Sequence, residues 1–179
     1  MLRLRGARGM PKMGISPRRN AFKRLVMAWQ YSDKTKILFM NAVNGNENSH
    51  FGEIADADGV GEHGSIACGD AMKFFFKVRR AENPVDDVII AAKYSTFGCT
   101  SAIASSEALC EIIEKGEYTP IEALKIRNED IVKFLEGLPS QKIHCSVMGA
   151  EALEAAVADW AQKRGVDLEA LGVHLESKE

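Results

Sequence analysis

Apolar and polar residues alternate in the middle of this chain and recur with a helical period after it. In residues 71–80 the apolar side chains of one face are interleaved with a mostly basic face, which predicts a half-buried strand. One face holds Met72, Phe74, Phe76 and Val78, and the other holds Lys73, Phe75, Lys77 and Arg79. A turn at residues 82–84 precedes a β-branched run at residues 85–94, so we predict an antiparallel hairpin.

Helical spacing and capping residues predict five further elements. They are a short helix over residues 29–40, one over 101–115 that ends at Gly116, one that starts with a capping box at Thr119 and Glu122, one over 128–135 capped by Asn128, and a long amphipathic helix over 146–163. Residues 41–64 are rich in Gly, Asn and Asp, and we expect a loop there. A helix, then strands, then a run of helices is typical of an α+β fold. We therefore predict a small antiparallel β-sheet packed against helices.

The composition is that of an ordinary globular protein. Its 179 residues suffice for one domain with a buried core, and 46% of them are hydrophobic. The longest apolar runs have five residues, whereas a membrane-spanning helix needs roughly 18, so we expect no membrane span. Four cysteines are too few for a disulfide scaffold, and no apolar signal-peptide core is present. We therefore expect a reducing compartment and free thiols.

Charge is distributed unevenly between the first residues and the rest. Residues 1–27 hold eight Lys or Arg and no acid, and we interpret them as a basic leader that is dispensable or serves targeting. Residues 28–179 hold 15 basic and 25 acidic side chains, and this balance of −10 argues against a nucleic-acid-binding domain. We divide the chain into the leader 1–27, a folded domain 28–164 and a tail 165–179. The expected compartment is the cytoplasm of a bacterium or archaeon, or the mitochondrial matrix if the leader is a transit peptide.

Cys68 and Asp70 are the first candidates for metal chemistry. In an extended backbone residues i and i+2 point to the same side, so this thiol and carboxylate can converge on one ion, and Gly69 leaves the approach open. The alternative is a buried cysteine beside a turn aspartate, which is the commoner situation for a free cysteine. The tripeptide leaves both interpretations open.

Two more cysteines stand at predicted helix starts. Cys99 precedes one helix, and Cys145 follows His144 at the start of the last one; free N–H groups and the helix dipole favour a thiolate there. Cys110 lies about 16 Å along the helix axis from Cys99, too far for both to bind one ion, so we assign it to the core. Adjacent His144 and Cys145 diverge by about 100° on a helix, which disfavours a Cys–His hydrolase. The other histidines are expected to be solvated: His50, His63 and His174.

Three strings, in this order, resemble the cysteine motifs of the IscU family, which also forms the N-terminal domain of NifU. The strings are GSIACGDAMK, FGCTSAIASSEA and LPSQKIHCSVMGAEALEAA. The family consists of scaffold proteins for iron–sulfur cluster assembly, and the resemblance covers about residues 29–160. It implies that Cys68, Cys99 and Cys145 are cluster ligands. Asp70 matches the family's aspartate, and His144 matches its histidine and is an alternative ligand. Cys145 resembles the family's cysteine that receives persulfide sulfur.

The resemblance also implies partners and cargo. A [2Fe–2S] cluster is built from iron and from sulfur that a cysteine desulfurase delivers, and is passed to recipient apoproteins or carriers, so the chain is not expected to be an enzyme with its own turnover. Thiolates hold iron firmly, and a weaker oxygen or imidazole ligand makes a cluster releasable. The alternative is a zinc-binding sulfur acceptor of the SufU type. We find no long insertion between Cys99 and Cys145, which disfavours that branch. Zinc in the cluster-free form and a homodimer are left open.

Two surface features bear on partners. The string LPSQK stands where chaperone-dependent members carry LPPVK, so we do not expect recognition by an Hsp70-type chaperone. Lys73, Lys77 and Arg79 lie on one strand face and are candidates for docking a desulfurase. An ordinary solvated face is the alternative.

Overall fold

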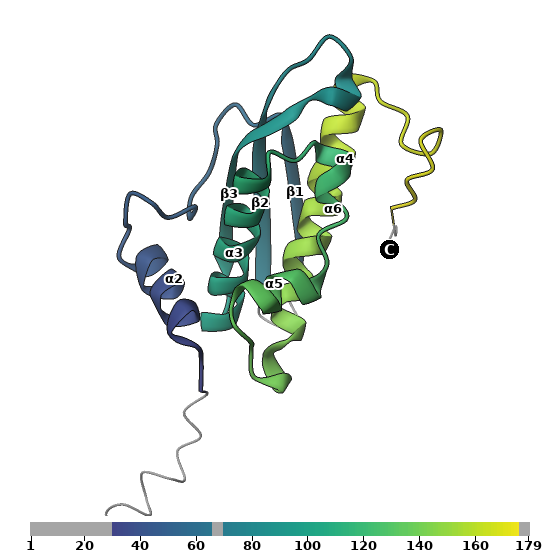
Figure 1. The fold of residues 1–179 in the computed structure, drawn as a ribbon. Coiled ribbons are helices and arrows are strands. Elements are labelled where there is room, and N and C mark those ends of the chain that lie inside the picture. The colour runs from purple at the N-terminus through teal and green to yellow at the C-terminus, as the bar shows by residue number, and fades with distance from the viewer. Residues whose placement is uncertain (1–29, 66–69, 176–179) are drawn as a thin grey trace, which may run out of the picture.

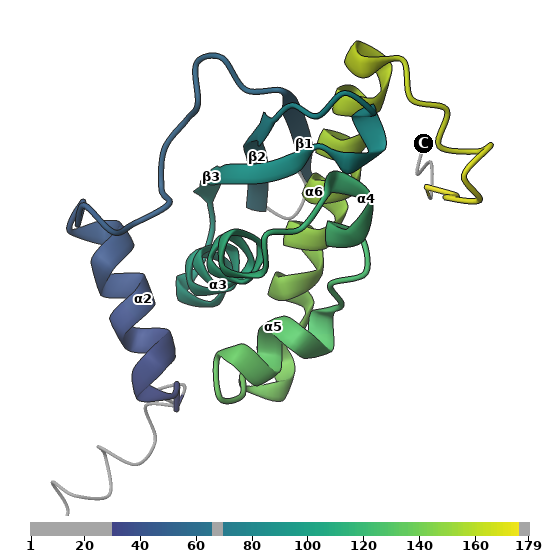
Figure 2. The same ribbon diagram turned by 45° about the horizontal axis from the view of Figure 1, so that its top comes forward.

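The computed structural model describes residues 30–65 and 70–175, and of residues 65, 70 and 144 the backbone only. A three-stranded antiparallel sheet has the order β1-β2-β3, and helices α3 and α6 cover one of its faces (Figures 1 and 2). The strands are β1 (Gly59–Ser65), β2 (Asp70–Arg79) and β3 (Val88–Phe97). The helices are α2 (Asp33–Val43), α3 (Thr100–Gly116), α4 (Pro120–Ala123), α5 (Asn128–Phe134) and α6 (His144–Arg164), with 3₁₀ turns at Pro84–Asp86 and Ser140–Lys142. The predicted α+β fold is confirmed.

The predicted hairpin is present as β2 and β3. Phe74 pairs with Tyr94 across the two strands, and the register shifts at a bulge between Lys77 and Val78. The predicted apolar face of β2 is buried against the helices. The second strand begins at Val88 rather than at residue 85, because the 3₁₀ turn takes the residues before it.

The expectation of a loop throughout residues 41–64 is wrong, since β1 lies within it and pairs with β2. The two buried positions of β1 within residues 59–64 are glycines, Gly59 and Gly61, so no apolar alternation marks the strand. A Cβ atom on Gly61 would lie 2.2 Å from the Ala152 oxygen and the Ala156 nitrogen of α6. The helix backbone packs directly on the strand, and only glycine leaves room for it.

The helix caps agree with the sequence in part. Ser32 caps α2, and the Thr119–Glu122 capping box at α4 is present with both of its hydrogen bonds. Two expected caps are wrong, although α3 ends at Gly116 as predicted. Asn128 is the first residue of α5 and not its cap, and the C-cap of α3 is Glu117, in the left-handed conformation with φ 49°, rather than Gly116.

A buried carboxylate ties the end of α6 to the β2–β3 turn. Asp87 is fully buried and accepts hydrogen bonds from Arg164 at 2.8 and 2.9 Å, from the Trp160 indole at 3.2 Å and from the Ala81 backbone N–H at 2.8 Å. Each carboxylate oxygen thus receives two donors. This arrangement fixes the far end of the helix whose first turn carries Cys145.

Candidate metal centre

Cys99 lies between the end of β3 and the start of α3. It is the N-cap residue of α3, with φ −80° and ψ 173°, so its side chain lies beside the unpaired backbone N–H groups of the first helical turn. The sequence predicted this position. The residue is half-buried and reduced.

The start of α6 brings a second thiol to the first. Helix α6 begins at His144, two residues earlier than predicted, which places Cys145 in its first turn. The Cys145 and Cys99 sulfurs lie 3.5 Å apart. Two thiolates on one tetrahedral metal ion with bonds of about 2.3 Å lie about 3.8 Å apart. The separation of the two sulfurs is therefore close to that of two ligands that share one ion.

The electrostatic surroundings favour a thiolate at Cys99. Burial acts to raise the pKa of the Cys99 thiol. This effect is outweighed by nearby donors and charge: the Ala102 backbone N–H, the Cys145 thiol, the Ser101 backbone N–H and the Lys142 ammonium. The pKa of Cys99 therefore lies below its usual value. Our sequence reasoning did not single out Lys142. Its only sequence signal is a basic residue three positions before Cys145.

The other proposed ligands are placed only in part. Cys68 lies outside the described residues, and for Asp70 and His144 the backbone alone is described. Asp70 pairs with Ser65 at the start of β2, and the next pair in the sheet joins Ala71 to Phe97 at the end of β3. The backbone of Asp70 is therefore at the same end of the sheet as Cys99. Among the side chains that the structure describes, no three potential metal ligands converge. The complete ligand set stays a prediction.

Cys145 and Cys110 differ in their surroundings although both are buried. Cys145 is 1% exposed and contacts Cys99. Cys110, on α3, is fully buried in the hydrophobic core of the domain, and that burial raises the pKa of its thiol. The assignment of Cys110 to the core is confirmed. The Cys145 sulfur becomes accessible to solvent only if the first turn of α6 or its neighbours move.

Two histidines expected in solvent are instead paired with carboxylates. His63 on β1 lies 2.8 Å from a carboxylate oxygen of Glu151 on α6. His50 donates its backbone N–H to Glu107, and its ring nitrogens lie 2.8 Å from Glu107 and 3.3 Å from Glu114. No periodic signal marks these pairs, because the partners lie far away in the sequence. His174 is exposed, as expected.

Replacing His50 by glutamine should lower the free energy of unfolding by about 3 kcal/mol near neutral pH. Burial acts to lower the pKa of His50, but hydrogen bonds and charge from Glu107 and Glu114 raise it to about 9. Because the folded value exceeds the unfolded one, the stabilisation is complete below about pH 6.5 and is lost as the pH rises through about 9. Urea unfolding across this range measures it, with the exposed His174→Gln as control. If the difference in unfolding free energy between the unchanged protein and His50→Gln stays constant up to about pH 10, His50 is not stabilised in its protonated form as argued.

The basic face of β2 is largely neutralised. Lys73 lies 2.6 Å from a carboxylate oxygen of Glu62, and Lys77 pairs with Asp56. Arg79 is exposed. These pairs weaken the positive field that would attract an acidic desulfurase surface, and favour the interpretation of an ordinary surface.

The comparisons with known proteins agree with the motif resemblance. The family model described as the NifU-like N-terminal domain matches residues 39–167. The chain belongs to this family. It is 49% identical over 142 residues to a protein of Nostoc named nitrogen fixation protein NifU, covering 79% of this chain and 44% of that protein. It is 44% identical over 140 residues to an Aquifex aeolicus protein named iron–sulfur cluster assembly scaffold protein IscU, covering 78% of this chain and 81% of that one.

A likeness in structure supports the fold. The crystal structure of a NifU-like N-terminal domain from Brucella abortus superposes with a TM-score of 0.55 at 15% identity, covering 74% of this chain and 94% of that one. This NifU-like chain spans less than half the length of the NifU proteins that it matches. Within the described residues no helix is long and apolar enough to cross a membrane.

Proposed function

We propose that this chain is a scaffold on which an iron–sulfur cluster is assembled and then handed on. The observation that supports this best is the pair of thiols at two helix N-termini, with sulfurs 3.5 Å apart and a lowered pKa at Cys99. Such a pair suits a soft metal centre with sulfur ligands. Membership of the NifU-like family and the name of the Aquifex relative support the same function.

The proposed cluster site combines the thiol pair with the segment before β2. Cys68, Cys99 and Cys145 supply three thiolates, and Asp70 completes the set, with His144 as the alternative fourth ligand. Four cysteines are the usual ligands of a [2Fe–2S] cluster. Replacement of one by a carboxylate or an imidazole leaves a point where an incoming thiolate of a recipient can enter. Assembly and release are thus features of one ligand set.

Sulfur enters, in this proposal, by exchange with a cysteine desulfurase. The Cys145 thiolate attacks the terminal sulfur of the donor's persulfide, a new S–S bond forms on Cys145, and the old S–S bond breaks to leave the donor's thiolate. The Cys145 proton passes to solvent when the neighbouring turn opens, because the lowered pKa of Cys99 makes its thiolate a weak proton acceptor. Since the desulfurase generates the persulfide, the scaffold needs no turnover of its own.

Anaerobic reconstitution tests this function. The full chain, stripped of metal, is incubated with ferrous iron, cysteine, dithiothreitol as the reductant of persulfide to sulfide, and a catalytic amount of cysteine desulfurase. It is then analysed for iron, acid-labile sulfide and visible absorption. We expect equal amounts of iron and sulfide bound to the protein and a brown, oxygen-sensitive chromophore that passes to an apo-ferredoxin. A protein that forms no chromophore, keeps one zinc ion and still accepts sulfur would support the zinc-binding sulfur acceptor instead. The mass of the loaded protein in solution shows whether two copies share the cluster.

A further inference from the structure

A pocket lies between α2, the second half of α3 and α5. Its volume is about 540 Å³, which is within the usual range of sites for small organic molecules. Ile112 of α3 contributes to its wall and stands about 20 Å along the helix axis from Cys99. The pocket is therefore separate from the thiol pair, and the proposed scaffold function does not use it.

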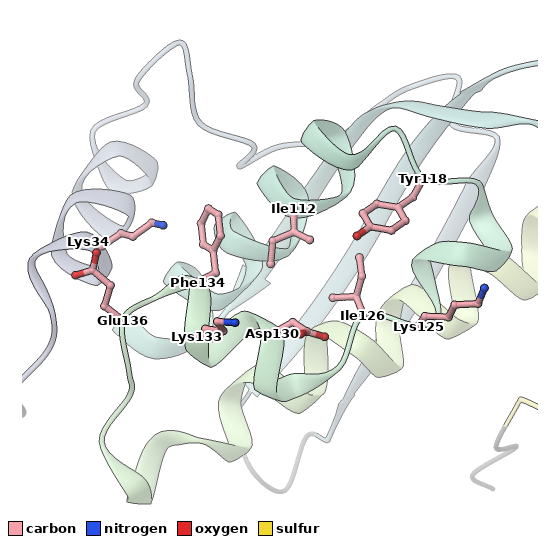
Figure 3. Close-up of a pocket in the computed structure, with 9 residues that line it drawn as sticks. All are labelled: Lys34, Ile112, Tyr118, Lys125, Ile126, Asp130, Lys133, Phe134 and Glu136. Atoms are coloured by element: carbon pink, nitrogen blue, oxygen red, sulfur yellow. The ribbon is translucent and has the colours of Figure 1, made fainter.

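The floor of the pocket is apolar. Ile112, Ile126 and Phe134 face it from three different segments (Figure 3). Ile126 lies in the short connection between α4 and α5, but its side chain is buried in the main core, which holds this part of the floor in place. An organic body with an aromatic or branched group would displace water from it.

Lysines surround this floor. The Lys34 ammonium lies over the Phe134 ring, 3.4 Å from its centroid, and Lys125 and Lys133 are exposed at the rim. Within the described part of the chain, none of these three forms an ion pair with a carboxylate. Of the acids at the pocket, Asp130 is occupied as an acceptor for the Arg127 backbone N–H at 2.9 Å. Glu136 also lines the pocket and is exposed, so three lysines face two carboxylates and the rim carries a small net positive charge.

A hydroxyl group adds a directed donor. Tyr118 is half-buried, and its hydroxyl points into the pocket toward Ile126 (Figure 3). It has no hydrogen-bond partner among residues 30–65 and 70–175. A half-buried hydroxyl with no protein partner and ammonium groups with no carboxylate are groups that an anionic ligand satisfies.

We propose that this pocket binds a small organic carboxylate with an apolar body. The body packs on Ile112, Ile126 and Phe134, and the carboxylate lies at the Tyr118 hydroxyl in the positive field of the Lys125 and Lys133 ammonium groups. Ammonium and hydroxyl donors select the charged ligand over a neutral one of equal shape, because hydrogen bonds to ionised groups are about twice as strong as neutral ones.

Binding of 4-phenylbutyrate and of its neutral amide, 4-phenylbutyramide, tests the proposal in the full chain. Backbone NMR shifts followed during titration locate each probe and measure its dissociation constant. We expect the carboxylate to shift the signals around Tyr118 and Ile126. The dissociation constant of the amide should be at least about tenfold higher. Equal binding of the two probes, or shifts confined to other surfaces, would overturn the proposal.

Charge reversal at the rim gives an independent result. The double variant Lys125→Glu/Lys133→Glu should weaken 4-phenylbutyrate binding by about tenfold or more. Arg79→Glu, on the exposed face of β2, should change it by less than about twofold. Tyr118→Phe keeps the ring and removes the hydroxyl, and should weaken binding severalfold. If the double variant does not fold, the Tyr118→Phe protein and the two-probe comparison decide the question. Unchanged affinity in Tyr118→Phe and in the double variant would refute the assignment.

Discussion

Cys99→Ser protein should bind at least about tenfold less iron and sulfide than the unchanged protein after anaerobic reconstitution. Loss of an outer hydrogen-bond partner already costs a metal site about 10–100-fold in affinity, and loss of a ligand removes more. Serine keeps the helix-capping position but has no thiolate for iron. Cys145→Ser should behave in the same way, since its sulfur lies 3.5 Å from that of Cys99. The measurement is iron and acid-labile sulfide per chain.

Cys110→Ala is the matched control for this loss. The residue lies in the same helix as Cys99 but is fully buried in the core, so the substitution leaves a small cavity at a cost of about 1 kcal/mol. Its iron and sulfide content should equal that of the unchanged protein. A folded Cys110→Ala protein without a cluster, or a Cys99→Ser protein with a full one, would show that the proposed ligand set is wrong.

Asp87→Ala should lower the free energy of unfolding by about 3 kcal/mol and the melting temperature by about 10 °C. The substitution leaves the Arg164 guanidinium, the Trp160 indole and the Ala81 N–H without their common acceptor. Burial acts to raise the pKa of Asp87, but Arg164, Ala81 and Trp160 hold it below its usual value. Because the folded value is the lower one, this stabilisation is present above about pH 4 and disappears as the pH falls further.

The neighbouring residue supplies the control for Asp87. Asp86→Ala removes the same charge from an exposed position and should change stability by less than about 0.5 kcal/mol. Thermal unfolding followed by circular dichroism at about pH 7 and about pH 3 measures both variants. Equal effects of the two substitutions, or an Asp87→Ala effect that is no smaller at about pH 3 than at about pH 7, would mean that the buried network does not stabilise the fold as argued.

Local patterns were sufficient for those parts of the fold that are built from local interactions. The alternation in β2 predicted its buried face, since side chains at every second position of a strand share one side. Thr119 and Glu122 predicted the start of α4, because both capping hydrogen bonds join residues three apart. The position of Cys99 before a helix likewise followed from the change of period after Gly98.

Strand β1 could not be predicted in this way. Its buried residues within 59–64 are Gly59 and Gly61, which carry no apolar signal. They are glycines because the backbone of α6 approaches so closely that a Cβ would collide with it. That approach is a property of the packed domain, and no window of neighbouring residues contains it.

By itself the sequence determined which residue types are available for chemistry and which elements carry them. The resemblance of three cysteine motifs to those of the IscU family implied a metal–sulfur site, and geometry along one helix separated Cys110 from Cys99. Only the tertiary structure decided that the starts of α3 and α6 meet, with the Cys99 and Cys145 sulfurs 3.5 Å apart, and that His50 pairs with Glu107 and Glu114. These contacts join residues 46 or more positions apart. Long-range contacts of this kind depend on how helices pack on the sheet, and burial and charge then set the pKa values of the groups that meet.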